Sequence, residues 1–214
     1  MPVKTESREY RRINAPFETR SEEDGGMIVE GYATTFNQPY ELYRENGCVL
    51  MEQVDIDAFN ETDMSDVIMQ YDHEGRVFAR ASNGTLKLEN DFHGLKVTAN
   101  LGGTEIGRQL YEEIRGGYTD KMSFGFTVAA QDRKERRMED GSIEILRTIT
   151  KIGKLYDVSA VSLPANDATE ISARKISDGL IEEARKELQA REEREHKIRE
   201  LKKLLGKETD NDAE

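Results

Sequence analysis

Hydrophobic and polar residues alternate along much of the chain between residues 27 and 161, with the period of two that β-strands require. The run Met27–Phe36 is rich in β-branched and aromatic residues, which predicts a strand. The alternating runs Thr85–Glu89 and Leu95–Leu101 flank a short polar turn and predict a hairpin. Further strands are expected at Val67–Tyr71, Ile143–Ile149 and Leu155–Leu163. Several short strands joined by polar turns favour a barrel or a sandwich.

One helical pattern interrupts the strands. Thr104 is a suitable N-cap, and Gly116-Gly117 supplies the stop signal. Between them, apolar residues recur at helical spacing, namely Ile106, Leu110, Tyr111 and Ile114. A strand through Met122–Val128 follows almost at once, so Ser123 is expected near the start of a strand.

The composition changes after about residue 171. The last 41 residues carry 11 Lys or Arg and 12 Asp or Glu, with no aromatic residue and no proline. A narrow apolar stripe persists through Ile176, Leu180, Ile181, Ala184, Leu188, Ile198, Leu201, Leu204 and Leu205. We therefore expect a polar segment over residues 1–24, a folded domain over 25–172, an amphipathic charged helix over 173–207 and a disordered tail over 208–214.

Composition and charge exclude several classes of function. The 214-residue chain has a formal net charge of -12, which argues against a nucleic-acid partner. No apolar run approaches the ~20 residues needed to cross a bilayer, so no membrane partner is expected. The first residues lack the apolar core of a signal peptide, which indicates a protein kept in the cytosol. The single cysteine, Cys48, cannot form an internal disulfide, and neither a metal nor another cofactor is expected, because no cluster of ligands or phosphate loop is present.

Three histidines limit the choice of a general base. His93 lies in a polar turn and His196 in the charged helix, and both are explained as surface residues. His73 ends an apolar run, and an imidazole with a pKa of ~6.5 is the best available base. The alternative is that His73 merely ends a strand.

Alternation divides the strand around Ser123 into two faces. Met122, Phe124 and Phe126 lie on one face, while Ser123 and Gly125 lie on the other. The small Gly125 would leave room for a substrate backbone to approach Ser123. The alternative is an ordinary strand with its polar face toward solvent.

Asp157 lies within an otherwise apolar strand, where an unpaired charge is costly. If Asp157 points inward it needs a hydrogen-bonding partner, and His73 is the obvious candidate. If it points outward, Ser159 shares its polar face. Ser159 and Ser162 are also rival nucleophiles.

Four segments in this order resemble the prohead maturation serine proteases of HK97-like tailed bacteriophages, over about residues 26–168. They are Glu30–Asn37, Asp72-His73, Met122–Phe126 and Tyr156–Asn166. The resemblance implies a compact antiparallel β-barrel with packed helices, so the expected fold class is α+β, mainly β, with the long charged helix appended.

The resemblance also implies a catalytic triad of Ser123 as nucleophile, His73 as general base and Asp157 as the acid. The family more often carries Glu at the third position, and Asp is one methylene shorter. Asp157 must therefore approach His73 closely or act through water. For the oxyanion, the turn after this strand suggests a backbone amide near Ala165 or Asn166.

The implied function is a serine endopeptidase that cleaves the scaffolding segment of the major capsid protein, and itself, inside the procapsid in the host cytoplasm. A homo-oligomer is expected. The charged helix is expected to dock on a capsid or scaffold partner, and the alternative is that it folds back on the barrel. The competing function is a non-catalytic capsid scaffold or assembly protein.

Overall fold

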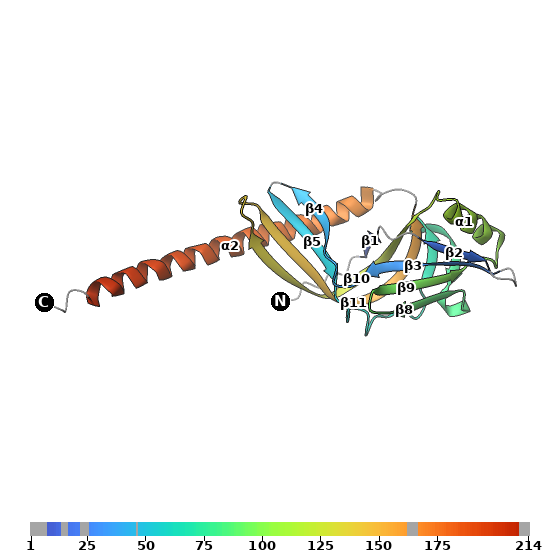
Figure 1. Cartoon of the computed structure of the whole chain (residues 1–214), viewed down its shortest axis with the longest axis horizontal. Helices are drawn as coiled ribbons and strands as arrows, with labels where there is room; N and C mark the ends of the chain where they lie inside the picture. The colour runs from blue at the N-terminus through green and yellow to red at the C-terminus, as the bar shows by residue number, and fades with distance from the viewer. Residues whose placement is uncertain (1–7, 14–16, 22–25, 46, 162–166, 210–214) are drawn as a thin grey trace.

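The computed structural model describes residues 8–13, 17–21, 26–45, 47–161 and 167–209, and it is mainly β with two α-helices (Figure 1). The strands are β1 (Glu9–Ile13), β2 (Glu18–Ser21), β3 (Met27–Thr35), β4 (Tyr40–Glu45), β5 (Cys48–Val54), β6 (Ile68–Tyr71), β7 (Glu74–Arg80), β8 (Leu86–Asn90), β9 (Gly94–Asn100), β10 (Lys121–Arg137) and β11 (Ile143–Val161). The helices are α1 (Glu105–Arg115) and α2 (Asp167–Thr209), and a 3-10 turn covers Ala81–Asn83. The predicted class, α+β and mainly β, is confirmed.

Two sheets make up the domain. The larger has the strand order β1-β10-β11-β5-β4, with β6 also pairing with β11 and β7 pairing with β6. The smaller has the order β2-β3-β9-β8. The long β11 runs parallel to β5 along its first part and parallel to β6 along its last part. The larger sheet is therefore mixed rather than antiparallel. No pairing between the described strands closes either sheet, so the predicted barrel is not confirmed.

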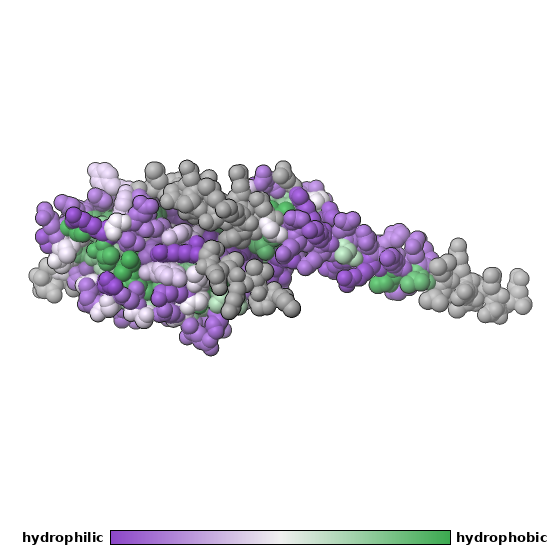
Figure 2. Space-filling view, turned by 180° about the vertical axis from the view of Figure 1, so that it is seen from behind, coloured by the Kyte–Doolittle hydropathy of each residue, from purple (hydrophilic) through white to green (hydrophobic). Residues whose placement is uncertain are grey.

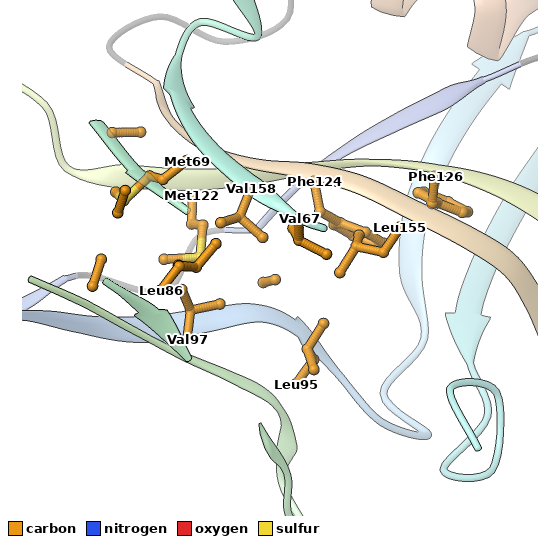
Figure 3. Packing of buried hydrophobic residues seen from close by; sticks show 14 of the residues in the cluster. Val67, Met69, Leu86, Leu95, Val97, Met122, Phe124, Phe126, Leu155 and Val158 are labelled. Carbon is orange, nitrogen blue, oxygen red and sulfur yellow. The ribbon is translucent and has the colours of Figure 1, made fainter. Parts of the chain in front are cut away.

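The main apolar core lies where the inner faces of the two sheets meet. Met122 and Phe124 of β10 and Val158 of β11 pack with Leu86 and Val97 of the smaller sheet (Figure 3). All five side chains are buried. The alternation predicted for β10 is thus confirmed, because its apolar face is the one that packs into the core.

Local sequence signals predict two elements well. The hairpin expected around residues 85–101 is β8–β9, whose strands pair antiparallel. The helix expected after Thr104 is α1, and the Gly107 amide donates to the Thr104 side-chain oxygen at 3.1 Å. This N-cap bond satisfies one of the free amides at the helix start.

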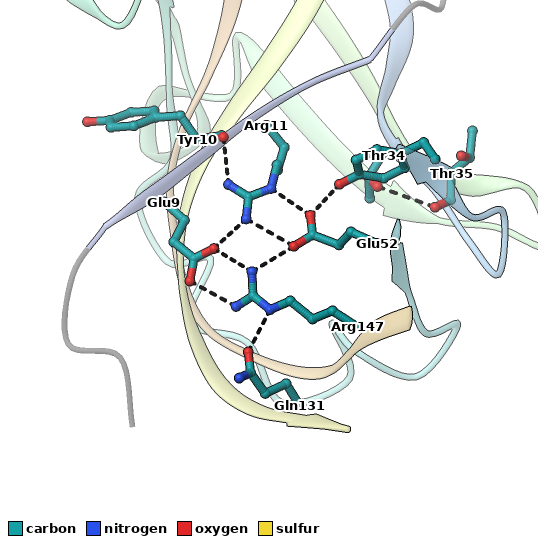
Figure 4. Close-up of polar contacts among 9 residues, drawn as sticks. Glu9, Tyr10, Arg11, Thr34, Thr35, Glu52, Gln131 and Arg147 are labelled. Carbon is teal, nitrogen blue, oxygen red and sulfur yellow. Dashed lines mark hydrogen bonds and ion pairs between the residues drawn. The ribbon is translucent and has the colours of Figure 1, made fainter. Parts of the chain in front are cut away.

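Four charged side chains form a buried ionic cluster: Glu9 and Arg11 of β1, Glu52 of β5 and Arg147 of β11 (Figure 4). Each is at most 3% exposed. Arg11 donates to Glu52 and to Glu9 at 2.6 Å each. Arg147 donates to Glu52 at 2.6 Å and to Glu9 at 2.9 Å. Burial alone would raise the pKa of Glu52, but Arg11 and Arg147 outweigh it and lower this pKa to about 2. Glu52 is therefore charged, and each of the two carboxylates contacts both arginines.

The N-terminal segment contributes two strands to the sheets, although the domain was predicted to begin at residue 25. β1 pairs antiparallel with β10, with Tyr10 opposite Gly125 and Arg11 opposite Phe124. β2 pairs with β3 at the edge of the smaller sheet. Residues 1–24 look polar because 11 of these 24 residues are charged, yet Glu9 and Arg11 of β1 are buried with partners from distant strands.

The first part of α2 folds back on the domain. Ile181 and Ala184 are buried against Leu50 and Ile145, and Arg133 of β10 pairs with Glu183 at 2.8 Å. Beyond it, every residue from 191 to 203 is exposed, and the helix projects away from the sheets (Figure 1). This projecting part is mostly hydrophilic (Figure 2). Partner binding by α2 thus stays a prediction for its distal part only. A disordered tail was predicted over residues 208–214, but α2 includes Glu208 and Thr209, and residues 210–214 lie outside the described residues.

Candidate active site

His73 lies in a two-residue turn that joins β6 to β7. Asp72 and His73 both have positive φ, 47° and 62°, as in the type I′ turns of tight hairpins. Non-glycine residues rarely adopt this conformation, so the surroundings must hold it. The Asp72 amide donates to the Ala160 carbonyl at 3.0 Å, and the His73 amide donates to Ser159 Oγ at 3.2 Å. Both bonds fix the turn against β11.

Ser123 and Asp157 share one face of the larger sheet. In the antiparallel pairing of β10 with β11, Ser123 is opposite Ser159 and Gly125 is opposite Asp157. Directly opposed residues point to the same side of a sheet. The face is the one away from the core, as alternation predicted, but Arg8, Tyr10 and other side chains cover it, so that Asp157 is fully buried.

The three predicted residues form one continuous line of hydrogen bonds. Ser123 Oγ lies 2.6 Å from His73 Nε2, and His73 Nδ1 lies 2.5 Å from Asp157 Oδ1. Ser123 is only 5% exposed. Asp157 was expected to reach His73 either directly or through water, and in the structure it contacts His73 directly. The arrangement can therefore pass a proton from a hydroxyl to an imidazole that a carboxylate orients.

The Asp157 carboxylate has donors on both oxygens. The Ser159 hydroxyl donates to Oδ1 at 2.9 Å, on the same oxygen as His73. The Arg8 guanidinium donates to Oδ2. A buried carboxylate needs such partners, because it has lost its water.

The space beside Gly125 is already filled. A Cβ atom added there would lie 2.4 Å from Asp157 Oδ2 and 2.9 Å from both Arg8 Nε and Tyr10 Cε1. The expectation that Gly125 leaves room for a substrate backbone is therefore wrong. Its missing side chain instead makes room for the carboxylate and for the residues that cover it.

Burial, and secondly the positive charge of Arg8, lower the pKa of His73 to about 4. The Tyr10 ring also covers the imidazole, with ring centroids 4.4 Å apart. His73 is consequently neutral at pH 7, the state in which Nε2 can accept a proton.

The other candidate residues lie elsewhere. His93 lies in the β8–β9 turn, 4.6 Å from the Tyr32 ring by centroids, and His196 is exposed on α2. Cys48 is buried. Ser162, Ala165 and Asn166 lie outside the described residues, so the rival nucleophile and the oxyanion donors stay predictions. Within the part of the chain that the structure describes, there is no group of three metal-ligating side chains and no helix apolar enough to span a membrane.

The sequence did not point to Arg8, which directly precedes β1, or to Tyr10 of β1, and both residues cover the site. Neither belongs to a recognisable pattern, and both lie in the segment taken as a polar leader to the domain. The one available signal was indirect: a carboxylate buried in the Asp157 strand requires a second donor besides His73.

Comparisons with known proteins place these residues in a family. No curated protein is significantly similar to the chain in sequence. Among solved structures, the capsid assembly protease of bacteriophage T4 is a distant match, with 12% identity and a TM-score of 0.37, over 72% of this chain and 98% of its own. The family model of the caudovirus prohead serine proteases matches residues 15–182. The chain therefore belongs to the caudovirus prohead serine protease family.

Proposed function

We propose that this protein is a serine endopeptidase of phage capsid maturation, in which Ser123 is the nucleophile, His73 the general base and Asp157 the orienting acid. Membership of the family supports the protease role. The single observation that supports the residue assignment is the unbroken line from Ser123 Oγ through both ring nitrogens of His73 to Asp157.

The line of hydrogen bonds supports the following direction of proton transfer. His73 donates its Nδ1 proton to Asp157, so Nε2 is free to accept the proton of Ser123. As Ser123 Oγ bonds to the scissile carbonyl carbon, its proton moves to Nε2. The imidazolium then gives this proton to the leaving amine nitrogen, and the peptide C–N bond breaks. Water, deprotonated by the same base, hydrolyses the acyl-enzyme and restores Ser123.

Asp157 contributes through charge and orientation. Its contact with Nδ1 fixes the tautomer of His73 and stabilises the imidazolium that forms during each step. Because His73 is neutral before the reaction, the positive charge appears only in the transition state and is then paired with a buried carboxylate. Such preorganised charges are among the largest contributions to catalysis.

The substrate follows from the family resemblance rather than from the site. The proposed target is the scaffolding segment of the major capsid protein, together with the protease chain itself, in a homo-oligomer inside the procapsid in the host cell. The exposed distal part of α2 is available for contact with another assembly protein.

Co-expression with the cognate major capsid protein tests the proposal. Wild type should trim the capsid protein, while Ser123→Ala should leave it whole and Ser65→Ala, a change at an exposed loop serine, should match wild type. Trimming by Ser123→Ala at the wild-type rate would refute the assignment.

A serine-reactive phosphonate gives an independent measurement. Mass spectrometry of the assembled protein should find the label on Ser123 in wild type and in Ser65→Ala, and on no residue in Ser123→Ala. Labelling of a different residue would identify another nucleophile. If wild type neither trims nor labels, the non-catalytic scaffold is the better description.

A further inference from the structure

The Asp157 carboxylate is shared between two partners, the neutral imidazole of His73 and the guanidinium of Arg8, which contact different oxygens. Oδ1 faces His73, while Oδ2 faces the guanidinium of Arg8, 149 residues earlier in the chain. Asp157 is fully buried, so neither oxygen can be satisfied by bulk water. Arg8 therefore supplies the donor that the proposed triad itself does not.

The structure holds Arg8 in a defined position. Its guanidinium carbon lies 4.6 Å from the centroid of the Tyr156 ring and 5.1 Å from that of Tyr10. An arginine between two aromatic rings loses rotational freedom and gains cation–π attraction. The space that Gly125 leaves open lets the guanidinium come this close, because an added Cβ would lie 2.9 Å from Arg8 Nε.

We propose that Arg8 is a positioning residue of this site, which holds Asp157 Oδ2 so that Oδ1 stays directed at His73. The proposal rests on the proposed function of Ser123, His73 and Asp157. It assigns a role in catalysis to a residue that lies outside the segments that resemble the family, directly before β1, in the segment 1–24 predicted to precede the domain. Arg8 does not touch the reacting atoms and acts through Asp157.

Arg8 also sets the balance of charge around His73. Without the guanidinium, the buried carboxylate beside the imidazole would have no cationic partner, and it would favour the protonated ring. Among the described residues, the other charged or titratable groups on this face or on the turn make no hydrogen bond or ion pair with Asp157; they are Tyr10, Arg12, Asp72, Glu74 and Tyr156. Loss of Arg8 should therefore raise the pKa of His73, which both burial and Arg8 lower.

The test measures the rate of phosphonate labelling of Ser123 against pH, using the assembled full-length protein. Arg8→Ala should slow labelling at pH 7 by about 10²-fold, the effect of a misplaced catalytic group. It should also move the acid limb of the profile upward by about one pH unit, as expected when a cation is removed from a neighbouring ion pair. Arg8→Lys keeps the charge but loses the planar set of guanidinium donors. It should leave the acid limb of the pH profile in place and recover part of the labelling rate.

The matched control is Arg20→Ala, which removes an exposed arginine from β2, the other strand of the N-terminal segment. Its labelling rate and the acid limb of its pH profile should equal those of wild type. If Arg8→Ala does not fold in a thermal unfolding assay, Arg8→Gln replaces it, because glutamine keeps a donor and much of the side chain without the charge. The acid limb of the labelling profile of Arg8→Gln should move to higher pH in the same way.

The outcomes separate this inference from the proposed function. If wild type labels Ser123 but Arg8→Ala or Arg8→Gln shows the wild-type limb, whether or not the rate falls, Arg8 does not act on the site and the inference is wrong. If label appears at wild-type rate in Ser123→Ala, the proposed function itself fails. A raised limb with partial recovery by Arg8→Lys supports the inference.

Discussion

Gly125→Ala should inactivate the protein although the change adds a single methyl group. The new Cβ would lie 2.4 Å from Asp157 Oδ2 and 2.9 Å from Arg8 Nε and Tyr10 Cε1. Ordinary contacts of this kind begin near ~3.4 Å, so the carboxylate must move by about 1 Å. Asp157 is fully buried, and His73, Ser159 and Arg8 contact its oxygens, so moving it disturbs these bonds.

A displacement of this size has a large expected effect on rate. Moving a catalytic group by about 1 Å costs about 10²-fold, because the reacting atoms leave their aligned positions. The same overlap should lower the free energy of unfolding by about 1–3 kcal/mol, which is the usual cost of overpacking. Activity should therefore fall far more than the folded fraction does.

The assay is phosphonate labelling of Ser123, run beside a thermal unfolding measurement. The control is Gly153→Ala, which adds a methyl group in the adjacent strand β11, where the nearest atom, Thr127 Oγ1, would lie 3.3 Å away. Gly153→Ala should label at close to the wild-type rate. Labelling of Gly125→Ala at the wild-type rate would refute the described packing of Asp157.

Three further predictions concern the charges of the site and the core. The labelling rate should stay constant from pH 8 to about 5 and fall near pH 4, because the lowered pKa of His73, about 4, keeps its imidazole neutral above that value; a limb near ~6.5 would contradict this. Asp157→Asn should lose about 10⁴-fold in capsid-trimming rate, since an amide favours the wrong tautomer of His73; a loss below tenfold would show that orientation by the acid matters little. Arg147→Ala should lower the free energy of unfolding, measured with urea, by about 3–5 kcal/mol because it leaves two buried carboxylates with one cation; Arg136→Ala, at an exposed ion pair, is the control and should unfold like wild type.

Local chemistry made part of the fold predictable from the sequence. The β8–β9 hairpin and the Thr104 cap of α1 depend on residues that are close in the chain, so their patterns are visible directly. The two faces of β10 were also readable, since alternation is a property of the strand itself. The sequence further placed Ser123, His73 and Asp157 among the candidate residues, and the structure brings these three together.

Long-range pairing was not predictable in the same way. β11 pairs in parallel with both β5 and β6, and no local pattern specifies a partner about 90 residues away. The polar appearance of β1 concealed it, because Arg11 is stabilised by Glu52, 41 residues further on. The Asp72-His73 turn lacks the glycine that marks such turns, and its conformation depends on bonds from β11.

The buried ionic cluster has a consequence for the register of β1. Because successive side chains of a strand alternate, Glu9 and Arg11 enter the cluster only when Tyr10 faces the site. A slip by one residue would drive the Tyr10 ring among the charges and leave Glu52 and Arg147 without their partners. A chain with β1 in the wrong register should therefore fold less stably. The ionic cluster thus favours the register of β1 that also places Tyr10 at the active site.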